Sequence, residues 1–89
     1  MPRKPKSQKA IEEVTYLLNM VAEDSSVPRN IRRAANNALK VMQDQSDSPA
    51  IRAANAIGLL DEVSQDPNCP LHARTRIYQI LSSLETIRD

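Results

Sequence analysis

Residues 17–39 read LLNMVAEDSSVPRNIRRAANNAL, and a related stretch, LLDEVSQDPNCPLHARTRIYQIL, follows 42 residues later. Identical residues keep the apolar positions, the turn and the proline of the two copies in phase. The identical pairs are Leu17/Leu59, Leu18/Leu60, Val21/Val63, Asp24/Asp66, Pro28/Pro70, Arg32/Arg74 and Leu39/Leu81. The chain is therefore predicted to use one unit, a helical hairpin, twice.

Apolar residues recur at intervals of three and four along the chain, which is the spacing of one helix face. This periodicity predicts helices over 8–23, 28–44, 49–65 and 70–88. A proline stands in the first turn of each of the last three helices, where proline is tolerated, and Ser48 is the clearest candidate cap. Because the connections are short, we expect consecutive helices to be antiparallel neighbours in an all-α, four-helix bundle.

Composition limits the class of protein. With 89 residues, one Gly and no Phe or Trp, the chain is predicted to be one domain with a core of aliphatic side chains. A basic start over residues 1–7 is predicted to be a disordered tail, and residues 8–89 the four-helix domain. No apolar run approaches the roughly 20 residues that span a bilayer. The single cysteine fits a reducing compartment, so a cytoplasmic protein is expected.

Two resemblances accompany the repeat. The pattern D-x-x-x-P-x-x-x-R before Ala or Leu resembles the second helix of a HEAT repeat, although solenoids usually need at least three units. Two hairpins are instead expected to close face to face as a bundle, or to pair with another chain. The stretches LLNMVAEDSSVPRNIRRAANNA and DPNCPLHARTRIYQILSSLE resemble a family of small archaeal helical proteins catalogued as uncharacterised. That resemblance implies a compact all-helical fold and transfers no activity to any residue.

Four residues are predicted to stabilise the hairpins. Arg32 and Arg74 each follow an aspartate, Asp24 or Asp66, by eight residues, and each pair recurs at the same phase of the repeat. In an up-and-down bundle the start of one helix lies beside the end of the preceding helix. The two arginines are therefore expected to reach the aspartates or the free carbonyl groups there, as in the ladder that HEAT repeats form.

Arg29 and Arg33 have no arginine counterpart in the second copy, so they are the better candidates for contact with an outside molecule. A helix start favours anions, and basic side chains nearby reinforce that preference. A nucleic-acid surface is predicted to combine these two with Arg3, Lys4, Lys6 and Lys9. The alternative is ordinary solvated charge, because the net charge is only +1 and no aromatic residues are interleaved to stack bases.

The sequence offers no catalytic constellation. One Gly rules out a glycine-rich phosphate loop, and the lone His72 without clustered ligands argues against a metal site. A reactive Cys69 close to His72 stays a minor alternative to a small residue at a helix cap. The adjacent acids of Glu12/Glu13 and Asp61/Glu62 point in different directions on a helix. We therefore predict no enzyme, no metal and no cofactor.

Two further features concern packing and partners. Tyr16 and Gly58 are equivalent positions under the 42-residue shift. The first helix is predicted to pack closely over Gly58, with the Tyr16 ring as the candidate contact.

Small residues give the second and third helices broad faces: Ala34, Ala35, Ala38, Ala50, Ala53, Ala54 and Ala56. Those faces either pack internally or dock a protein partner or a second copy. The function predicted is a non-enzymatic protein-interaction module, with a weak nucleic-acid accessory protein as the alternative.

Overall fold

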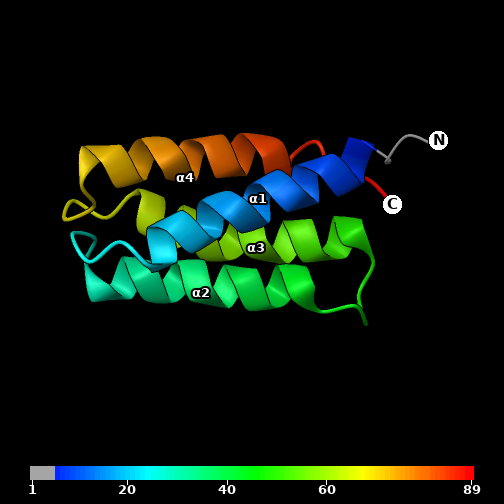
Figure 1. The fold of residues 1–89 in the computed structure, drawn as a ribbon, viewed down its shortest axis with the longest axis horizontal. Helices are drawn as coiled ribbons and strands as arrows, with labels where there is room; N and C mark the ends of the chain where they lie inside the picture. The colour runs from blue at the N-terminus through cyan, green and yellow to red at the C-terminus, as the bar shows by residue number, and fades with distance from the viewer. Residues whose placement is uncertain (1–5) are drawn as a thin grey trace.

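The computed structural model describes residues 6–89, which form four helices and no strand. The helices are α1 (Lys6–Ala22), α2 (Arg29–Gln43), α3 (Pro49–Ser64) and α4 (Leu71–Leu84). They run up and down as an antiparallel bundle (Figure 1), in which α1 and α3 each pack against both α2 and α4. The predicted four-helix bundle is confirmed. The HEAT resemblance and the 42-residue repeat stay predictions.

The core is aliphatic, as the composition indicated. Each helix buries the residues of its three- and four-residue period, and the buried set includes Leu18, Ile31, Leu60, Ile77, Ile80 and Leu84. Four of the seven alanines in the small-residue faces are buried between helices, and of the other three only Ala54 is exposed. Most of those alanines therefore serve packing inside the bundle.

The start of α1 and the end of α4 differ from the predicted bounds. Helix α1 begins at Lys6, so the start of the helix includes Lys6 and Ser7, which were expected in the tail; residues 1–5 lie outside the described residues. Helix α4 ends at Leu84, four residues early, because the chain tightens to bonds such as Ile87 N–H to the Leu84 carbonyl. Ile87 stays buried after this turn.

The three turns between helices share one local design. In each turn an aspartate accepts a hydrogen bond from the backbone N–H two residues later, the geometry of an Asx turn. The N–H donors are Ser26 to Asp24 at 2.9 Å, Ser46 to Asp44 at 3.0 Å, and Asn68 to Asp66 at 2.8 Å. An arginine follows each aspartate by eight residues, namely Arg32, Arg52 and Arg74. The middle turn was missed because a 42-residue shift compares only the first and third.

Two of these arginines bind the end of the preceding helical segment. The Arg52 Nη1 donates to the Met42 carbonyl at 2.7 Å, and the Arg74 Nη2 donates to the Asp66 carbonyl at 3.0 Å. Helix ends leave carbonyl groups without intrahelical donors, and these guanidinium groups supply a donor there. Arg52 is only 7% exposed. Each of the two arginines therefore ties the start of one helix to the turn and helix end that precede it.

The predicted contact at Gly58 is wrong. Gly58 is exposed, and a Cβ placed on it would meet no atom within 4 Å. Tyr16 is 65% exposed and lies on α1, which packs on α2 and α4 rather than on α3. A sequence shift equates two positions in a repeat, but equivalent positions on separate hairpins have no reason to touch.

Candidate nucleic-acid interface

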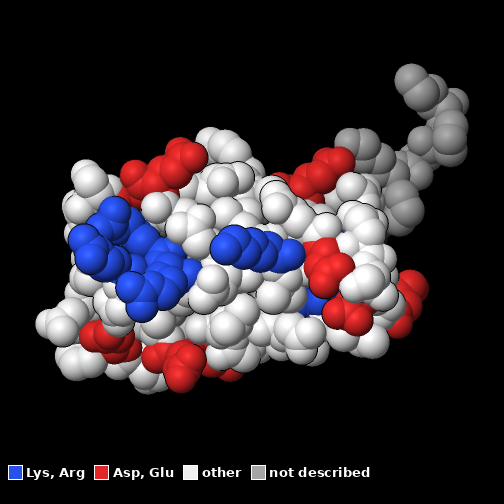
Figure 2. Space-filling view, turned by 90° about the horizontal axis from the view of Figure 1, so that it is seen from below, with Lys and Arg blue, Asp and Glu red and all other residues white. Residues whose placement is uncertain are grey.

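Helix α2 carries a basic face without any acidic residue. Its sequence, RNIRRAANNALKVMQ, includes four cations and no Asp or Glu. All four line one shallow groove together with Ala22 and two amides; the polar lining residues are Arg29, Arg32, Arg33, Asn36, Asn37 and Lys40. Basic side chains gather at one end of this face, with another toward its middle, and acidic side chains lie along its edges (Figure 2). The groove concentrates the positive charge of the bundle on one helix.

The cations of this groove are unpaired. Within residues 6–89, none of Arg29, Arg32, Arg33 and Lys40 makes an ion pair or a side-chain hydrogen bond with another residue. Arg29, Arg33 and Lys40 are exposed, and Arg32 is half-buried with an Nε that has no hydrogen-bond partner. Pro28 caps α2 without a side-chain acceptor, so the positive end of the helix dipole also lies at this end of the groove.

The basic surface predicted from the sequence is only partly assembled. Arg29 and Arg33 lie together, one turn apart, as expected. Lys9 lies near the start of α1, at the opposite end of the bundle, beside Glu13. About 20 Å of helix separates that end from the α1–α2 turn, at 1.5 Å per residue. Lys6 opens α1 at the same far end, and Arg3 and Lys4 lie outside the described residues. Lys9 therefore does not extend the α2 face.

The predicted ladder forms in one hairpin only, through a carbonyl group. Arg74 reaches the Asp66 backbone, as described above, whereas Arg32 makes no contact of this kind with Asp24 and lies in the α2 groove. The Asp24 carboxylate is occupied by other donors, namely Ser26 and His72. Arg32 is thus better grouped with Arg29 and Arg33 than with the scaffold.

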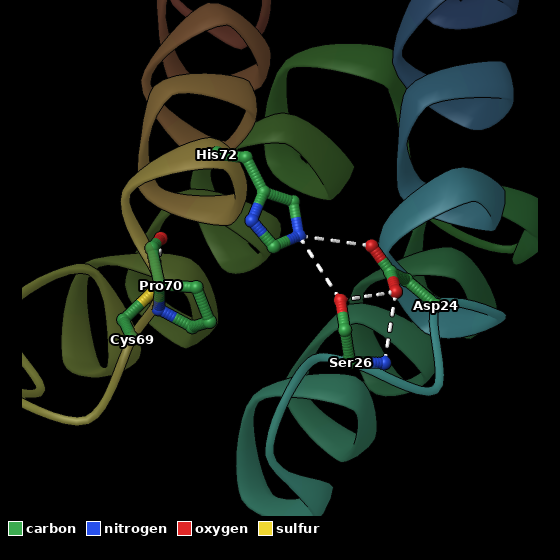
Figure 3. Close-up of polar contacts among 5 residues, drawn as sticks. All are labelled: Asp24, Ser26, Cys69, Pro70 and His72. Atoms are coloured by element: carbon green, nitrogen blue, oxygen red, sulfur yellow. Dashed lines mark hydrogen bonds and ion pairs between the residues drawn. The ribbon is translucent and has the colours of Figure 1, made fainter.

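Asp24, Ser26 and His72 form a bridge between the α1–α2 turn and the start of α4 (Figure 3). Ser26 Oγ donates to Asp24 Oδ1 at 2.6 Å, while His72 Nε2 lies 3.0 Å from Asp24 Oδ2 and 3.2 Å from Ser26 Oγ. In a hydrolase triad the two imidazole nitrogens separate the serine from the aspartate. Here a single nitrogen faces both and the serine proton goes to the carboxylate, so the arrangement does not activate Ser26.

A second bridge links the same two turns in the opposite sense. Asn30 Nδ2 donates to Asp66 Oδ2 at 2.8 Å, joining the start of α2 to the α3–α4 turn. Under the 42-residue shift, Asp24 corresponds to Asp66 and Asn30 to His72. Each bridge therefore joins the aspartate of one hairpin to the same helix-start position of the other hairpin. The two bridges together tie the α1–α2 turn and the start of α2 to the α3–α4 turn and the start of α4.

Hydrogen bonds in the turns favour ionised aspartates. The Ser26 hydroxyl, then the Ser26 N–H and His72, lower the pKa of Asp24 to about 2. The Ser46 hydroxyl and N–H lower the pKa of Asp44, and the Asn68 N–H with the Asn30 amide lowers that of Asp66. Bonds to the charged form are the physical cause in each case. The turns are consequently most stable when the carboxylates carry charge.

Cys69 is a packing residue rather than a reactive thiol. It is 5% exposed, and burial raises its thiol pKa, which opposes the lowering expected from a helix start. Its Sγ lies 3.7 Å from the Pro70 carbonyl and apart from the His72 contacts (Figure 3). The minor alternative of a nucleophilic Cys69 is therefore not supported, since a neutral buried thiol reacts slowly.

Residues 6–89 contain no group of three or more His, Cys, Asp or Glu side chains placed to hold a metal ion. Over the same residues, no helix has the length and apolar character needed to cross a membrane.

Reasoning from the sequence missed the polar centre of the α2 face. Lys40, Asn36 and Asn37 were not among the predicted contact residues, yet they line the groove with the arginines. The signal was present: positions 29, 33, 36 and 40 follow one helix face, and no acid interrupts residues 29–43.

Comparisons with known proteins extend over nearly the whole chain. The model of an uncharacterised protein family (UPF0147) matches residues 2–87. A UPF0147 protein from Metallosphaera sedula is 57% identical over 79 residues, and one from Sulfurisphaera tokodaii is 54% identical over 79 residues; each alignment covers 89% of both chains. The crystal structure of MMP1188, a protein of unknown function, has a TM-score of 0.91 at 40% identity and covers 99% of this chain and 100% of that one. A UPF0147 protein from Thermoplasma acidophilum has a TM-score of 0.89 at 36% identity, covering 93% and 98%.

Proposed function

This chain belongs to UPF0147, an archaeal family described as uncharacterised, and we propose that it is a non-enzymatic binding protein whose helix α2 contacts the phosphate backbone of a nucleic acid. The observation that carries the proposal is the α2 groove, where four unpaired cations lie on one helix that has no acid. Guanidinium groups match phosphate oxygens in geometry as well as charge. A surface of this kind has an anionic ligand as its natural complement.

The number of cations in the groove determines how strongly binding depends on salt. Acidic side chains along the edges of the face confine favourable contacts to α2 itself (Figure 2). Four cations that neutralise four phosphates give a slope of about −3 to −4 in log affinity against log salt. Binding is therefore expected to be weak at physiological salt and clear at low salt, as suits an accessory protein.

Fluorescence anisotropy with a labelled nucleic-acid probe over a salt series tests the proposal. The double variant Arg29→Glu/Arg33→Glu is expected to abolish binding at low salt. Its matched control, Lys9→Glu/Arg88→Glu, makes the same change in net charge at the other end of the bundle, where both side chains are exposed. At the 0.1 M point of the salt series the Debye length is about 10 Å, which is shorter than the distance from these two residues to the groove, so the control is expected to bind there within about threefold of wild type. Equal losses in the two variants, or no binding by wild type, would overturn the proposal.

A protein-interaction module, with α3 as the docking face, is the second candidate. Ile51 is 50% exposed, and Ala54 and Gly58 are exposed on the same side of α3. A glycine in mid-helix costs roughly 1 kcal/mol relative to alanine, and nothing within the bundle needs the space that Gly58 leaves. A partner helix or a second copy packed on α3 would use that space. Sedimentation equilibrium tests self-association: a dimer that Ala54→Glu dissociates supports it, and a monomer at every concentration removes it.

A further inference from the structure

The centre of the α2 groove is formed by amides rather than cations. Asn36 and Asn37 lie between Arg33 and Lys40, both are exposed, and neither makes a side-chain hydrogen bond within residues 6–89. Asparagine is a weaker helix former than alanine or lysine because it favours turns and caps. Two adjacent asparagines in the middle of a helix therefore reduce helical stability without any internal contact that offsets the loss.

We infer that the ligand of this groove is double-stranded DNA, with α2 in the major groove and Asn36 and Asn37 facing base edges, an inference that rests on the function proposed above. Phosphate oxygens only accept hydrogen bonds, so a backbone contact would use the NH2 group of each asparagine and leave its carbonyl oxygen without a partner. A base edge can use both, because the N6 and N7 atoms of adenine match the donor and acceptor that an amide offers together.

The surface also selects against other nucleic acids. Proteins that hold single strands stack bases on aromatic side chains, but the two tyrosines of this chain lie on α1 and α4 and do not line the groove. The major groove of duplex RNA is too deep and narrow for side chains to read. The major groove of B-form DNA is about 12 Å wide and admits a helix.

The spacing of the cations suits this placement. Arg29 and Lys40 are eleven residues apart, which is about 16 Å along a helix at 1.5 Å per residue. They bracket the two asparagines, so the ends of α2 contact phosphates while its centre meets base edges. Phosphate contacts fix position and base contacts give sequence preference.

Two measurements on the whole chain test this inference. First, anisotropy compares labelled duplex DNA, duplex RNA and single-stranded DNA of equal length at low salt. Second, duplex DNA selected from a randomised pool by wild type is compared with that selected by Asn36→Ala/Asn37→Ala, with Asn19→Ala/Asn55→Ala as the control at two exposed asparagines outside the groove. Circular dichroism checks that each variant is folded.

The expected result is tightest binding to duplex DNA and selection of a short site that contains adenine. The Asn36→Ala/Asn37→Ala variant should lose about tenfold or more of the preference for the selected site over unselected DNA. The control should keep that preference. Equal or tighter binding to RNA or single strands, or an unchanged preference in the groove variant, overturns the inference while leaving α2 as the binding face. Absence of binding to all three probes overturns the proposed function as well.

Discussion

Replacing Arg52 by Met should destabilise the bundle, although Arg52 lies in no binding surface. The substitution keeps an unbranched apolar stem and removes the bond from Nη1 to the Met42 carbonyl, which is 2.7 Å long and buried. A hydrogen bond from a charged group contributes about 1.5–3 kcal/mol. The same side chain buries an Nε without a partner, and removing that group returns about 1 kcal/mol. The net loss of unfolding free energy is then about 0.5–2 kcal/mol.

Urea unfolding followed by circular dichroism at 222 nm measures this loss. For a chain of this size, 1 kcal/mol corresponds to about 4–8 °C in Tm, so thermal scans should show the effect independently. Arg33→Met on the exposed side of α2 is the matched control and should change the unfolding free energy by less than about 0.5 kcal/mol. If Arg52→Met is no more destabilising than Arg33→Met, the carbonyl contact does not hold α3 to the end of α2.

Three further predictions concern other parts of the bundle. Gly58→Ala should raise the unfolding free energy by about 0.5–1 kcal/mol, because the new Cβ meets nothing and alanine favours the helix; an unchanged or lower midpoint in urea would contradict this. The Asp24 pKa of about 2 lies below the unfolded value of about 3.9, so its stabilisation is complete above pH 4 and lost as the pH falls toward 2. Wild type should therefore lose more Tm between pH 4 and pH 2 than Asp24→Asn, and equal losses would count against the turn contacts. Burial and the raised pKa of Cys69 predict that an aromatic disulfide reagent at pH 7 modifies it only in urea; rapid modification of the folded protein would show an accessible thiolate.

Local signals in the sequence predicted most of the fold. The apolar period and the three prolines placed all four helices, because burial of one face and the fixed φ of proline act over a few residues. The end of α4 was not predictable in the same way. It depends on the last residues of the chain: the Asp89 carboxylate accepts a hydrogen bond from Ala50 N–H at the start of α3, and the Arg88 carbonyl accepts one from the Ser7 hydroxyl.

The candidate site was predicted only in part, because some of its residues follow from local patterns and others depend on contacts between distant parts of the chain. Arg29 and Arg33 were identified because they break the repeat, and helix geometry alone could have added Lys40 and the asparagines. The bridge from Asp24 to His72 spans 48 residues of sequence and depends on α4 packing beside α1. The pairing of Arg32 with Asp24 was predicted wrongly because Ser26 and His72, rather than an arginine, are the donors that reach that carboxylate.

If α2 is the surface that meets a nucleic acid, NMR should map the contact to this helix. In a titration of ¹⁵N-labelled protein with a short DNA duplex at low salt, we expect the backbone amides of residues 29–40 and the side-chain amides of Asn36 and Asn37 to shift together, saturably and reversibly on addition of salt. Shifts concentrated on α3 or α4, or no shifts at all, would show that α2 is not the binding surface.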